Sequence, residues 1–285
     1  MSRIAYVNGR YLPHRHASVH VEDRGYQFAD GVYEVCEVWN GHLMDERRHL
    51  DRLERSLSEL AIPAPMSRVA LSAVLHEVVR RNGVRDGLVY LQVTRGVARR
   101  DHPFPPAGTR PSVVVTARRS DRAAQAALAA QGVGVITVPE NRWPRVDIKS
   151  TSLLPNVLAK QQAKEAGCRE AWFVDASGHV TEGASTNAWI VTADRRILTR
   201  PADHGILRGI TRTVVLEVAA GLGYTVEERA FTVAEALVAP EAFITAATTV
   251  VMPVVRIDGK PVGDGRPGPV ATSMRLKFHD YSEAS

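Results

Sequence analysis

Two Asn-Gly pairs stand near the start of the chain, at residues 8–9 and 40–41, and each separates two runs of strand-forming residues. Asn and Gly tolerate the positive φ angles that both central positions of a type I′ turn require. Such a turn joins two neighbouring antiparallel strands. The chain is therefore predicted to begin with two β-hairpins.

Helical patterns follow these hairpins. Four leucines between residues 46 and 61 recur at a 3-4-3 spacing, which places them on one face of a helix. A second helix is expected to start at a Ser67 cap and to stop at Gly83, because glycine is a favoured residue just past a helix end. With strands expected at 89–94 and 113–116, the first third of the chain is predicted to be an α+β unit.

Residues 117–125 are polar and rich in Arg and Asp, which is typical of a short connection between domains. We expect two domains in an α+β or α/β fold: a small N-terminal α+β domain over residues 1–119, and a larger C-terminal domain over residues 120–285. The second domain is predicted to be rich in β-structure, with flanking helices. Its expected strands are 133–138, 171–174, 187–191, 242–247 and 250–257, and its expected helices are 155–166, 211–222 and 268–281.

Composition excludes several classes of protein. The 285 residues are 45% apolar and 24% charged, as in ordinary globular domains. The net charge is +5, from 36 Lys and Arg against 31 Asp and Glu, and the arginines occur as pairs scattered along the chain without interleaved aromatic residues, which argues against nucleic-acid recognition. The two cysteines lack metal-ligand spacing and cannot form a disulfide framework. Residues 1–13 lack the apolar run of a signal peptide, and no stretch approaches the roughly 20 apolar residues of a membrane span, so we expect a cytoplasmic protein without metal, nucleic acid or membrane.

Lys149 is the first candidate catalytic residue. The common motifs GxGxxG, GxxxxGK[ST], GxSxG and HExxH are absent from the chain. Lys149 instead stands between the apolar Ile148 and a Ser-Thr-Ser cluster at residues 150–152. Desolvation lowers the pKa of a lysine, so that its neutral amine can form an imine with a carbonyl group. The alternative is a solvated surface lysine, which is the commoner role.

Glu182 is the second candidate, within a stretch of small polar residues from 180 to 187. A carboxylate buried there needs a partner, and a protonated pyridine nitrogen is one that would hold positive charge in a cofactor ring. The alternative is a residue in the turn that leads from Gly178 to the next strand.

An anion-binding element is predicted at Gly209-Ile210-Thr211-Arg212, just before an apolar helix. The first backbone N–H groups of a helix have no partner within it, and the helix dipole favours a phosphate there. The alternative is an ordinary threonine cap without a ligand. Thr248 and Thr249, after the expected strand 242–247, could supply another hydroxyl or could satisfy their own backbone.

Tyr33, Arg100 and His102 form a candidate carboxylate-binding set. Arginine can clamp a carboxylate with two donors, and histidine and tyrosine can add one each. The alternative for Arg100 and His102 is a solvated loop, because prolines follow at 103, 105 and 106.

Taken together in this order, the motifs resemble the fold-type IV pyridoxal-phosphate enzymes, and within them the D-amino acid transaminases. The similarity covers nearly the whole chain, from Tyr6-Val7-Asn8-Gly9 to Ile257-Asp258-Gly259-Lys260. Its most specific parts are Asp147-Ile148-Lys149-Ser150, Thr181-Glu182-Gly183 and Gly209-Ile210-Thr211-Arg212. The resemblance implies pyridoxal 5′-phosphate as cofactor, and D-amino acids and 2-oxo acids as substrates.

The resemblance also implies roles for individual residues. Lys149 would be the Schiff-base lysine and proton shuttle, and Glu182 would pair with the pyridine nitrogen. Arg52, in the segment His49-Leu50-Asp51-Arg52-Leu53, would bind the cofactor phosphate together with the backbone of Ile210 and Thr211.

The subfamily depends on how the substrate carboxylate is held. The D-amino acid transaminases carry an Arg-x-His, matched by Arg100 and His102, with a tyrosine matched by Tyr33. In that family the Arg and His reach in from the partner subunit, so a homodimer with shared active sites is implied. The Tyr-x-Arg of the branched-chain L-amino acid transaminases is here Tyr90-Leu91-Gln92. The usual Ser-Thr-Thr before the last hairpin is Ala246-Ala247-Thr248, so one phosphate-binding hydroxyl is lost or supplied by Thr248.

Several alternatives stay open from the sequence. Branched-chain L-amino acid transaminases, (R)-amine transaminases and aminodeoxychorismate lyases share the fold, the lysine and the glutamate. Tyr33, Arg100 and His102 argue against them. A non-catalytic basic binding protein is suggested only by the basic isoelectric point.

Overall fold

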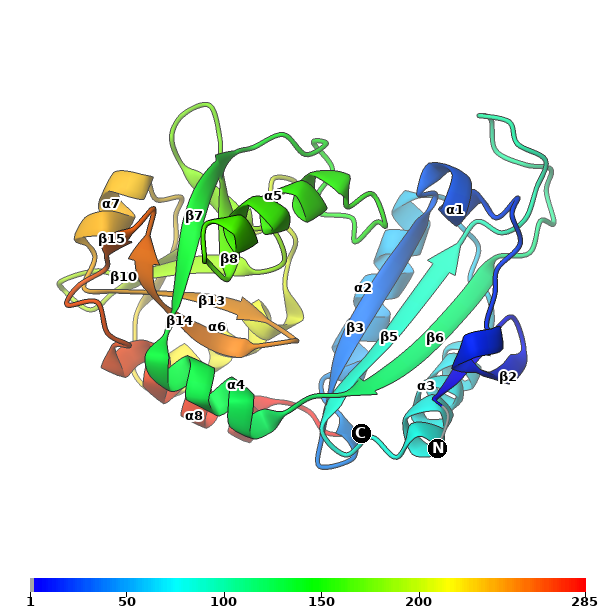
Figure 1. The fold of residues 1–285 in the computed structure, drawn as a ribbon, viewed down its shortest axis with the longest axis horizontal. Coiled ribbons are helices and arrows are strands. Elements are labelled where there is room, and N and C mark those ends of the chain that lie inside the picture. The colour runs from blue at the N-terminus through cyan, green and yellow to red at the C-terminus, as the bar shows by residue number, and fades with distance from the viewer. Residues whose placement is uncertain (1–2) are drawn as a thin grey trace. The chain divides into compact units, whose positions relative to one another are not determined.

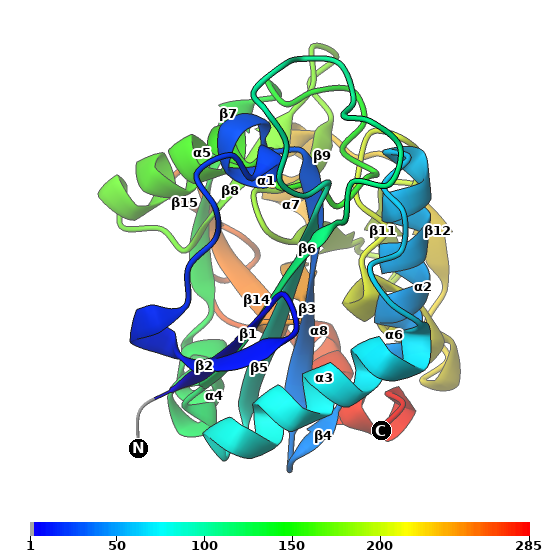
Figure 2. The same cartoon turned by 90° about the vertical axis from the view of Figure 1, so that its right-hand side faces the viewer.

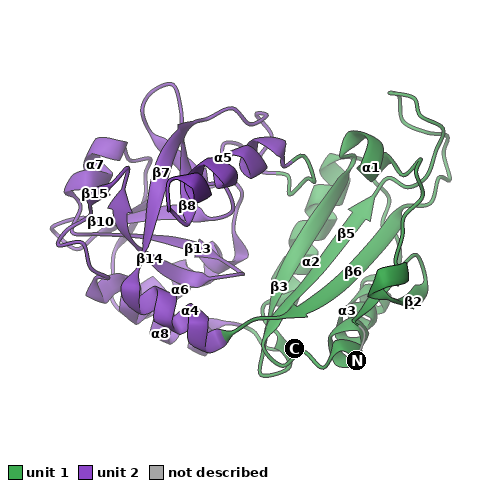
Figure 3. Cartoon of the chain, viewed as in Figure 1, with its two compact units in different colours: residues 1–121, 148–152, 283–285 green, residues 122–147, 153–282 purple. Residues whose placement is uncertain are grey.

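The computed structural model describes residues 3–285, which form two compact units (Figure 3). Unit 1 comprises residues 1–121, 148–152 and 283–285, and unit 2 comprises residues 122–147 and 153–282. The division expected after residue 119 differs from this grouping in one respect that matters for function. The segment with Lys149 was expected in the C-terminal domain, whereas here it belongs to unit 1.

Backbone hydrogen bonds explain why this segment belongs to unit 1. The N–H of Tyr33 donates to the carbonyl of Lys149 over 3.0 Å, and the N–H of Thr151 donates to the carbonyl of Gly31 over 3.0 Å. Ile148 is buried in the hydrophobic core of the same unit. Residues 148–152 therefore lie against strand β3 (Gly31–Trp39) as an added strand-like segment.

Unit 1 is built on a six-stranded antiparallel sheet with the strand order β2-β1-β6-β5-β3-β4 (Figure 1). Both predicted hairpins are confirmed, with positive φ at Asn8, Gly9, Asn40 and Gly41 as type I′ turns need. The other strands of the sheet are β1 (Ile4–Val7), β2 (Arg10–Pro13), β4 (His42–Leu43), β5 (Gly87–Thr94) and β6 (Ser112–Arg119).

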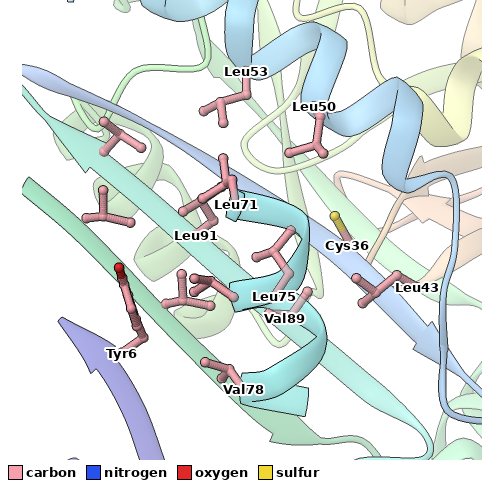
Figure 4. Packing of buried hydrophobic residues seen from close by; sticks show 14 of the residues in the cluster. Tyr6, Cys36, Leu43, Leu50, Leu53, Leu71, Leu75, Val78, Val89 and Leu91 are labelled. Atoms are coloured by element: carbon pink, nitrogen blue, oxygen red, sulfur yellow. The ribbon is translucent and has the colours of Figure 1, made fainter. Parts of the chain in front are cut away.

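Two helices, α2 (Glu46–Glu59) and α3 (Arg68–Asn82), pack beside the strands of this sheet (Figure 2). Ser67 accepts a hydrogen bond from the N–H of Ala70, and Gly83 adopts a φ of 55°, so both predicted ends of α3 are confirmed. Leucines of both helices meet the strands in one core (Figure 4). Short helices, η1 (His14–His16) and α1 (Arg24–Phe28), precede β3.

Unit 2 contains a nine-stranded mixed sheet in the order β12-β11-β10-β13-β14-β7-β8-β9, with β15 paired to β14. Strand β7 runs parallel to both of its neighbours, β14 and β8. The strands are β7 (Val133–Pro139), β8 (Glu170–Val174), β9 (Val180–Gly183), β10 (Asn187–Val191), β11 (Ile197–Thr199), β12 (Val226–Glu228), β13 (Glu241–Ala246), β14 (Val250–Ile257) and β15 (Lys260–Pro261). Unit 2 is therefore rich in β-structure, as the sequence predicts.

Apolar residues cover both faces of this sheet. On strand β10, Trp189 belongs to a core that includes helix residues from 214–219 and 270–278. Its neighbours Ala188 and Ile190 belong to a second core on the other face. Alternate residues of a strand point to opposite faces, so the fully apolar run Ala188–Val191 requires burial on both sides. The helices of the unit are α4 (Arg122–Gln131), α5 (Leu154–Glu165), α6 (Ile210–Gly221), α7 (Val233–Val238) and α8 (Pro269–Tyr281).

The polar segment 117–125 contains the end of the first run of unit 1, at Asp121, but most of the segment is regular structure, because β6 continues to Arg119 and α4 begins at Arg122. The alanine-rich sequence of α4 has a high helix propensity that outweighs its polar start. The alternative of a turn position for Glu182 is excluded, because residues 180–183 form strand β9 at the edge of the sheet.

Candidate active site

Lys149 lies beside Tyr33 in unit 1. The backbone of Lys149 is held on both sides, since its carbonyl accepts from the N–H of Tyr33 and its N–H donates to Ser56 Oγ over 3.4 Å. The Nζ atom lies 4.2 Å from the centroid of the Tyr33 ring, a cation–π distance. Two residues predicted from different parts of the chain are therefore brought together.

Tyr33 is itself held by the neighbouring strand. Its ring stacks on that of Tyr90, with centroids 5.7 Å apart, and the Tyr90 hydroxyl donates to Gln92 Oε1 over 2.7 Å. Burial, with a smaller effect from Tyr33, raises the pKa of Tyr90 to about 12. The Tyr90 hydroxyl therefore stays protonated even at alkaline pH and keeps its hydrogen bond to Gln92.

Arg52 belongs to a buried cluster of three charged or polar side chains. Its Nε and Nη2 atoms each donate to Glu34 over 2.8 Å, and His49 Nδ1 lies 2.7 Å from Glu34 Oε2. Burial by itself would raise the pKa of Glu34, but the charge and hydrogen bonds of Arg52 outweigh it and hold that pKa well below its usual range. The carboxylate thus orients the guanidinium of Arg52.

Glu34 and His49 were not identified from the sequence. A signal for Glu34 was present, because it alternates with Val32, Cys36 and Val38 on the inward face of β3. A carboxylate at an inward position needs a buried cation. The alternation therefore indicated a partner, although it did not say which arginine.

Glu182 is buried on strand β9 in unit 2, where three groups donate to its carboxylate. Arg142 Nη1 lies 2.6 Å and the N–H of Leu207 3.2 Å from Oε1, and Asn187 Nδ2 lies 3.0 Å from Oε2. Burial raises the pKa of Glu182, while Arg142 acts in the opposite direction. A buried carboxylate with this set of donors can keep its charge and still accept one more hydrogen bond.

Arg142 was not identified from the sequence. Its guanidinium also bonds Glu140 through Nε and Nη2, over 2.8 and 2.6 Å, and lies 4.4 Å from the centroid of the Phe173 ring. No spacing relates residue 142 to residue 182, because the two are brought together by the pairing of strands in the sheet. Only the fold reveals this partner.

The predicted anion-binding element is the first turn of helix α6. Gly209 is the N-cap residue and no side chain caps the helix, so the first N–H groups, those of Ile210 and Thr211, are available to an anion. A Cβ atom at residue 209 would lie 2.1 Å from Asn187 Oδ1. Glycine therefore lets the helix start close to the amide that bonds Glu182.

Thr248 lies at the surface in the turn between β13 and β14, whereas its neighbour Thr249 is buried. The Thr249 hydroxyl has no hydrogen-bond partner among residues 3–285. A buried hydroxyl without a partner is costly, so it indicates a ligand that is absent from the protein alone. Thr249 is thus a further candidate for the lost phosphate-binding hydroxyl.

Arg100 and His102 are exposed in the segment after strand β5. Both lie against Phe28 of helix α1, with the Arg100 guanidinium 5.1 Å and the His102 ring 5.5 Å from its ring centroid. The structure therefore brings these two predicted residues together on one aromatic support. Across the described residues, no group of three or more His, Cys, Asp or Glu side chains could hold a metal ion.

Comparisons with known proteins agree on one family. The class IV amino-transferase family matches residues 31–257. The chain is 42% identical over 276 residues to a D-alanine aminotransferase of Bacillus licheniformis, which covers 96% of this chain and 95% of that protein. It is 37% identical over 280 residues to a D-alanine aminotransferase of Staphylococcus haemolyticus, which covers 98% of both chains.

Solved structures agree on the fold. A branched-chain aminotransferase of Thermoproteus uzoniensis with norvaline has a TM-score of 0.86 and 26% identity, over 100% of this chain and 99% of that chain. A branched-chain amino acid aminotransferase of Escherichia coli has a TM-score of 0.87 and 24% identity, over 98% of this chain and 94% of that chain. The two-unit architecture is thus shared over nearly the whole length of both solved chains.

Proposed function

Because the chain belongs to the class IV aminotransferases, we propose that it transfers amino groups between D-amino acids and 2-oxo acids. Its cofactor is pyridoxal 5′-phosphate, which this family uses. D-Alanine and D-glutamate are the proposed donors, and 2-oxoglutarate and pyruvate the proposed acceptors. The observation that carries the proposal is the 37–42% identity to D-alanine aminotransferases over nearly the full chain.

The residues of this chain fit the cofactor. Glu182 offers a buried carboxylate that is suited to a protonated ring nitrogen, and the uncapped start of α6 offers N–H groups to a phosphate. The buried hydroxyl of Thr249 lacks a protein partner among the described residues. When bound, pyridoxal phosphate supplies an electron sink for the pair of electrons left when the substrate loses its α-proton.

We assign to Lys149 the covalent attachment of the cofactor and the transfer of the α-proton. As a free amine, its Nζ would take the proton from the substrate α-carbon. The support for this role is its position: the backbone is bonded to β3 and the amine lies on the Tyr33 ring. A base held in a fixed position stays close to the proton that it removes and favours one face of the substrate.

We assign to Glu182 the task of keeping the ring nitrogen protonated. The carboxylate must stay ionised for this, although its burial favours the neutral acid. Arg142 supplies the positive charge that opposes burial, while Asn187 and the N–H of Leu207 fix the orientation of the carboxylate. Arg142 is thus a positioning residue that acts through Glu182.

Arg52 and the N–H groups of Ile210 and Thr211 are the proposed phosphate ligands. Glu34 holds Arg52 through two hydrogen bonds, so the guanidinium is preorganised. For the additional hydroxyl we prefer Thr249 to Thr248, because the Thr249 hydroxyl is buried and without a partner in the described chain.

Tyr33, Arg100 and His102 are the proposed ligands of the substrate carboxylate. We propose a homodimer in which Arg100 and His102 of each chain serve the active site of the partner. The exposure of both side chains in a single chain supports this arrangement. We also infer a reducing compartment, the cytoplasm, because both cysteines of the chain are unpaired. Separately, no helix within residues 3–285 has the length and apolar character needed to span a membrane.

Branched-chain L-amino acid transamination is the second candidate, and the structural neighbour from Thermoproteus uzoniensis favours it. Against it stands Gln92, at the position where those enzymes typically carry arginine in Tyr-x-Arg. The Gln92 amide accepts a hydrogen bond from Tyr90 and brings no positive charge for a carboxylate.

A coupled assay tests the choice of substrate. Pyruvate formation from D-alanine is compared with that from L-alanine, with 2-oxoglutarate as acceptor, and L-leucine and (R)-phenylethylamine are assayed through their own products. We expect D-alanine to be the preferred donor. A preference for L-leucine would overturn the proposal in favour of the branched-chain alternative.

A further inference from the structure

Helix α1 carries a buried arginine that reaches the proposed carboxylate-binding segment. Arg24 is 4% exposed, and its Nη1 and Nη2 atoms donate to the backbone carbonyls of Asp101 and His102 over 2.6 and 3.2 Å. One guanidinium therefore holds two consecutive peptide groups of the segment that contains Arg100 and His102.

Asp30 fixes this arginine from the other side. Its Oδ2 atom accepts from Arg24 Nε over 2.8 Å and from Arg95 Nε over 2.7 Å. Arg95 also donates to the carbonyls of Leu60 and Ala61, at the end of α2. Burial alone would raise the pKa of Asp30, but hydrogen bonds from the two arginines hold it below its usual range. The segment is thus tied through Arg24 and Asp30 to the body of unit 1.

Helix α1 provides a rigid base for Arg24. The Arg24 N–H donates to the carbonyl of Gly96 over 2.9 Å, and Asp23 caps the helix by accepting from the N–H of Gly25 over 2.8 Å. Thr94, the last residue of β5, donates to the same Asp23 carboxylate over 3.1 Å. The start of helix α1, which carries Arg24, is therefore bonded to the end of β5 and to the residues that directly follow it.

Phe28 of the same helix supports the side chains. The guanidinium of Arg24 lies 4.8 Å from the centroid of its ring, on which Arg100 and His102 also lie. Apart from this ring, both side chains are exposed. Exposed donors bind a carboxylate well only if their backbone is held to within a few tenths of an ångström.

We propose that Arg24, locked by Asp30 and backed by Phe28, is the residue that positions Arg100 and His102 for the substrate carboxylate. This inference depends on the proposed function, since it concerns the same carboxylate. Arg24 does not touch the substrate in this scheme. Its effect reaches the substrate only through the backbone of residues 101 and 102.

Arg24→Lys tests the proposal, because lysine keeps the charge beside Asp30 but cannot donate to both carbonyls in one plane. We expect KM for D-alanine and D-glutamate to rise about tenfold with kcat within about twofold, as for the loss of uniform binding. A merely structural role would lower the amount of active enzyme and hence apparent kcat, with KM unchanged.

A second readout does not depend on activity. Trypsin cleaves after Arg99 and Arg100, and at low protease concentration the cleavage rate follows the fraction of molecules in which the segment has opened. We expect cleavage there to be at least threefold faster in Arg24→Lys than in the parent enzyme, with and without bound cofactor. Phe28→Leu should raise KM and the cleavage rate in the same way but more weakly. It is the test variant if Arg24→Lys does not fold.

Arg68→Lys is the matched control. Arg68 also donates to a backbone carbonyl, that of Arg47, and forms ion pairs with Asp51 and Glu54, but it lies on the helices of unit 1 away from the segment. The Arg68→Lys variant should leave KM and the cleavage rate unchanged.

The outcomes separate the two proposals. Cleavage and KM at parental values in both Arg24→Lys and Phe28→Leu, or a loss confined to kcat, would overturn the positioning role. A parent enzyme that does not transaminate D-amino acids would instead overturn the proposed function. The cleavage rates would still decide whether Arg24 anchors the segment.

Discussion

The guanidinium of Arg142 lies 2.6 Å from Glu182 Oε1, and both side chains are buried in unit 2. The same guanidinium bonds Glu140, so one cation serves two carboxylates. Removing a partner from a buried pair leaves an uncompensated charge, and the carboxyl group then takes up a proton. The ionisation of Glu182, and with it the proposed electron sink, therefore depends on a residue 40 positions earlier in the chain.

Arg142→Gln should make transamination dependent on alkaline pH. Without the cation, the hydrogen bonds from the Leu207 N–H and Asn187 remain but no positive charge opposes burial, so the pKa of Glu182 rises further; its ionised fraction at neutral pH then falls and recovers as the pH is raised. We expect kcat at pH 7 to fall tenfold or more and to recover in part by pH 9, measured as a pH profile. Arg142→Lys should keep a profile near that of the parent.

Glu182→Gln provides the reference for this experiment, because an amide cannot ionise. It should keep the fold and lose most activity at every pH. A parental pH profile in Arg142→Gln would contradict the role of Arg142. A parental rate in Glu182→Gln would contradict the role of Glu182.

Lys149→Ala should abolish transamination while the protein stays folded. The change removes the imine-forming amine and the base, but the backbone contacts of residue 149 with Tyr33 and Ser56 do not need the side chain. Borohydride should fix the cofactor onto the parent chain, detected by mass at Lys149, and should fix none onto the variant. Turnover near the parental value would exclude Lys149 as the catalytic base.

The hairpins and the long helices were predictable because their signals are local. Asn40-Gly41 determines its turn through backbone conformations that few other pairs adopt, and Ser67 and Gly83 mark the ends of α3 through contacts within one turn. The motifs around Lys149 and Glu182 were likewise visible as continuous residues. Such local preferences favour the same helix or turn whatever the rest of the fold is, as long as the fold has room for it.

The supporting residues were not predictable, because they meet their partners through the fold. Arg142 and Glu182 lie on different segments joined by strand pairing, and Arg24 reaches residues 101 and 102 only after β3 and β5 pair. The placement of residues 148–152 in unit 1 is of the same kind. It follows from hydrogen bonds to β3 that no linear spacing encodes.

Arg100→Ala should act on substrates that carry a carboxylate and spare those that do not. An arginine that bonds the carboxylate in both ground and transition states contributes mainly to KM, so we expect a loss of about 2 to 4 kcal/mol in kcat/KM for D-alanine and D-glutamate. His102→Ala should give a milder loss.

The comparison substrate is (R)-phenylethylamine, which has no carboxylate. Its kcat/KM should be unchanged or improved in both variants. Equal losses on both substrates would assign Arg100 to the fold or the dimer. No loss on either would leave the branched-chain alternative as the better description.

His49 should make the stability of the protein fall between pH 7 and pH 5. Burial lowers its pKa, although Glu34 opposes this, so the folded state keeps His49 neutral at a pH where the unfolded chain already binds the proton. Its contribution is therefore complete above the unfolded pKa of about 6.5 and is lost as the pH falls below that value. The loss by pH 5 amounts to at most about 2 kcal/mol.

His49→Asn isolates this effect, because asparagine can still donate to Glu34 but does not titrate. We expect the urea midpoint, followed by circular dichroism, to fall less steeply with acid in the variant. Glu34 does not interfere in this range, because its lowered pKa keeps it ionised in the folded state and its stabilising effect is lost only at more acidic pH. Parallel midpoint curves for the two proteins would show that His49 is not the titrating group.

Gly209→Ala should weaken cofactor binding through Asn187. The backbone at residue 209 has a φ of −63°, which alanine adopts readily, so the substitution acts through space alone. The new Cβ would lie 2.1 Å from Asn187 Oδ1, and the amide that donates to Glu182 and to the Leu207 carbonyl must move. We expect the Kd for pyridoxal phosphate, titrated into the cofactor-free protein, to rise about tenfold, which is about 1.4 kcal/mol.

A double-mutant cycle identifies the route of this effect. Asn187→Ala removes both the hydrogen bond to Glu182 and the atom that an alanine at residue 209 would meet. If Gly209→Ala acts by displacing Asn187, adding it to Asn187→Ala should cost little more, so the two losses should be far from additive. Additive losses would mean that the alanine disturbs the start of α6 itself, and that the N–H groups of Ile210 and Thr211, not the hold on Glu182, account for the weaker binding.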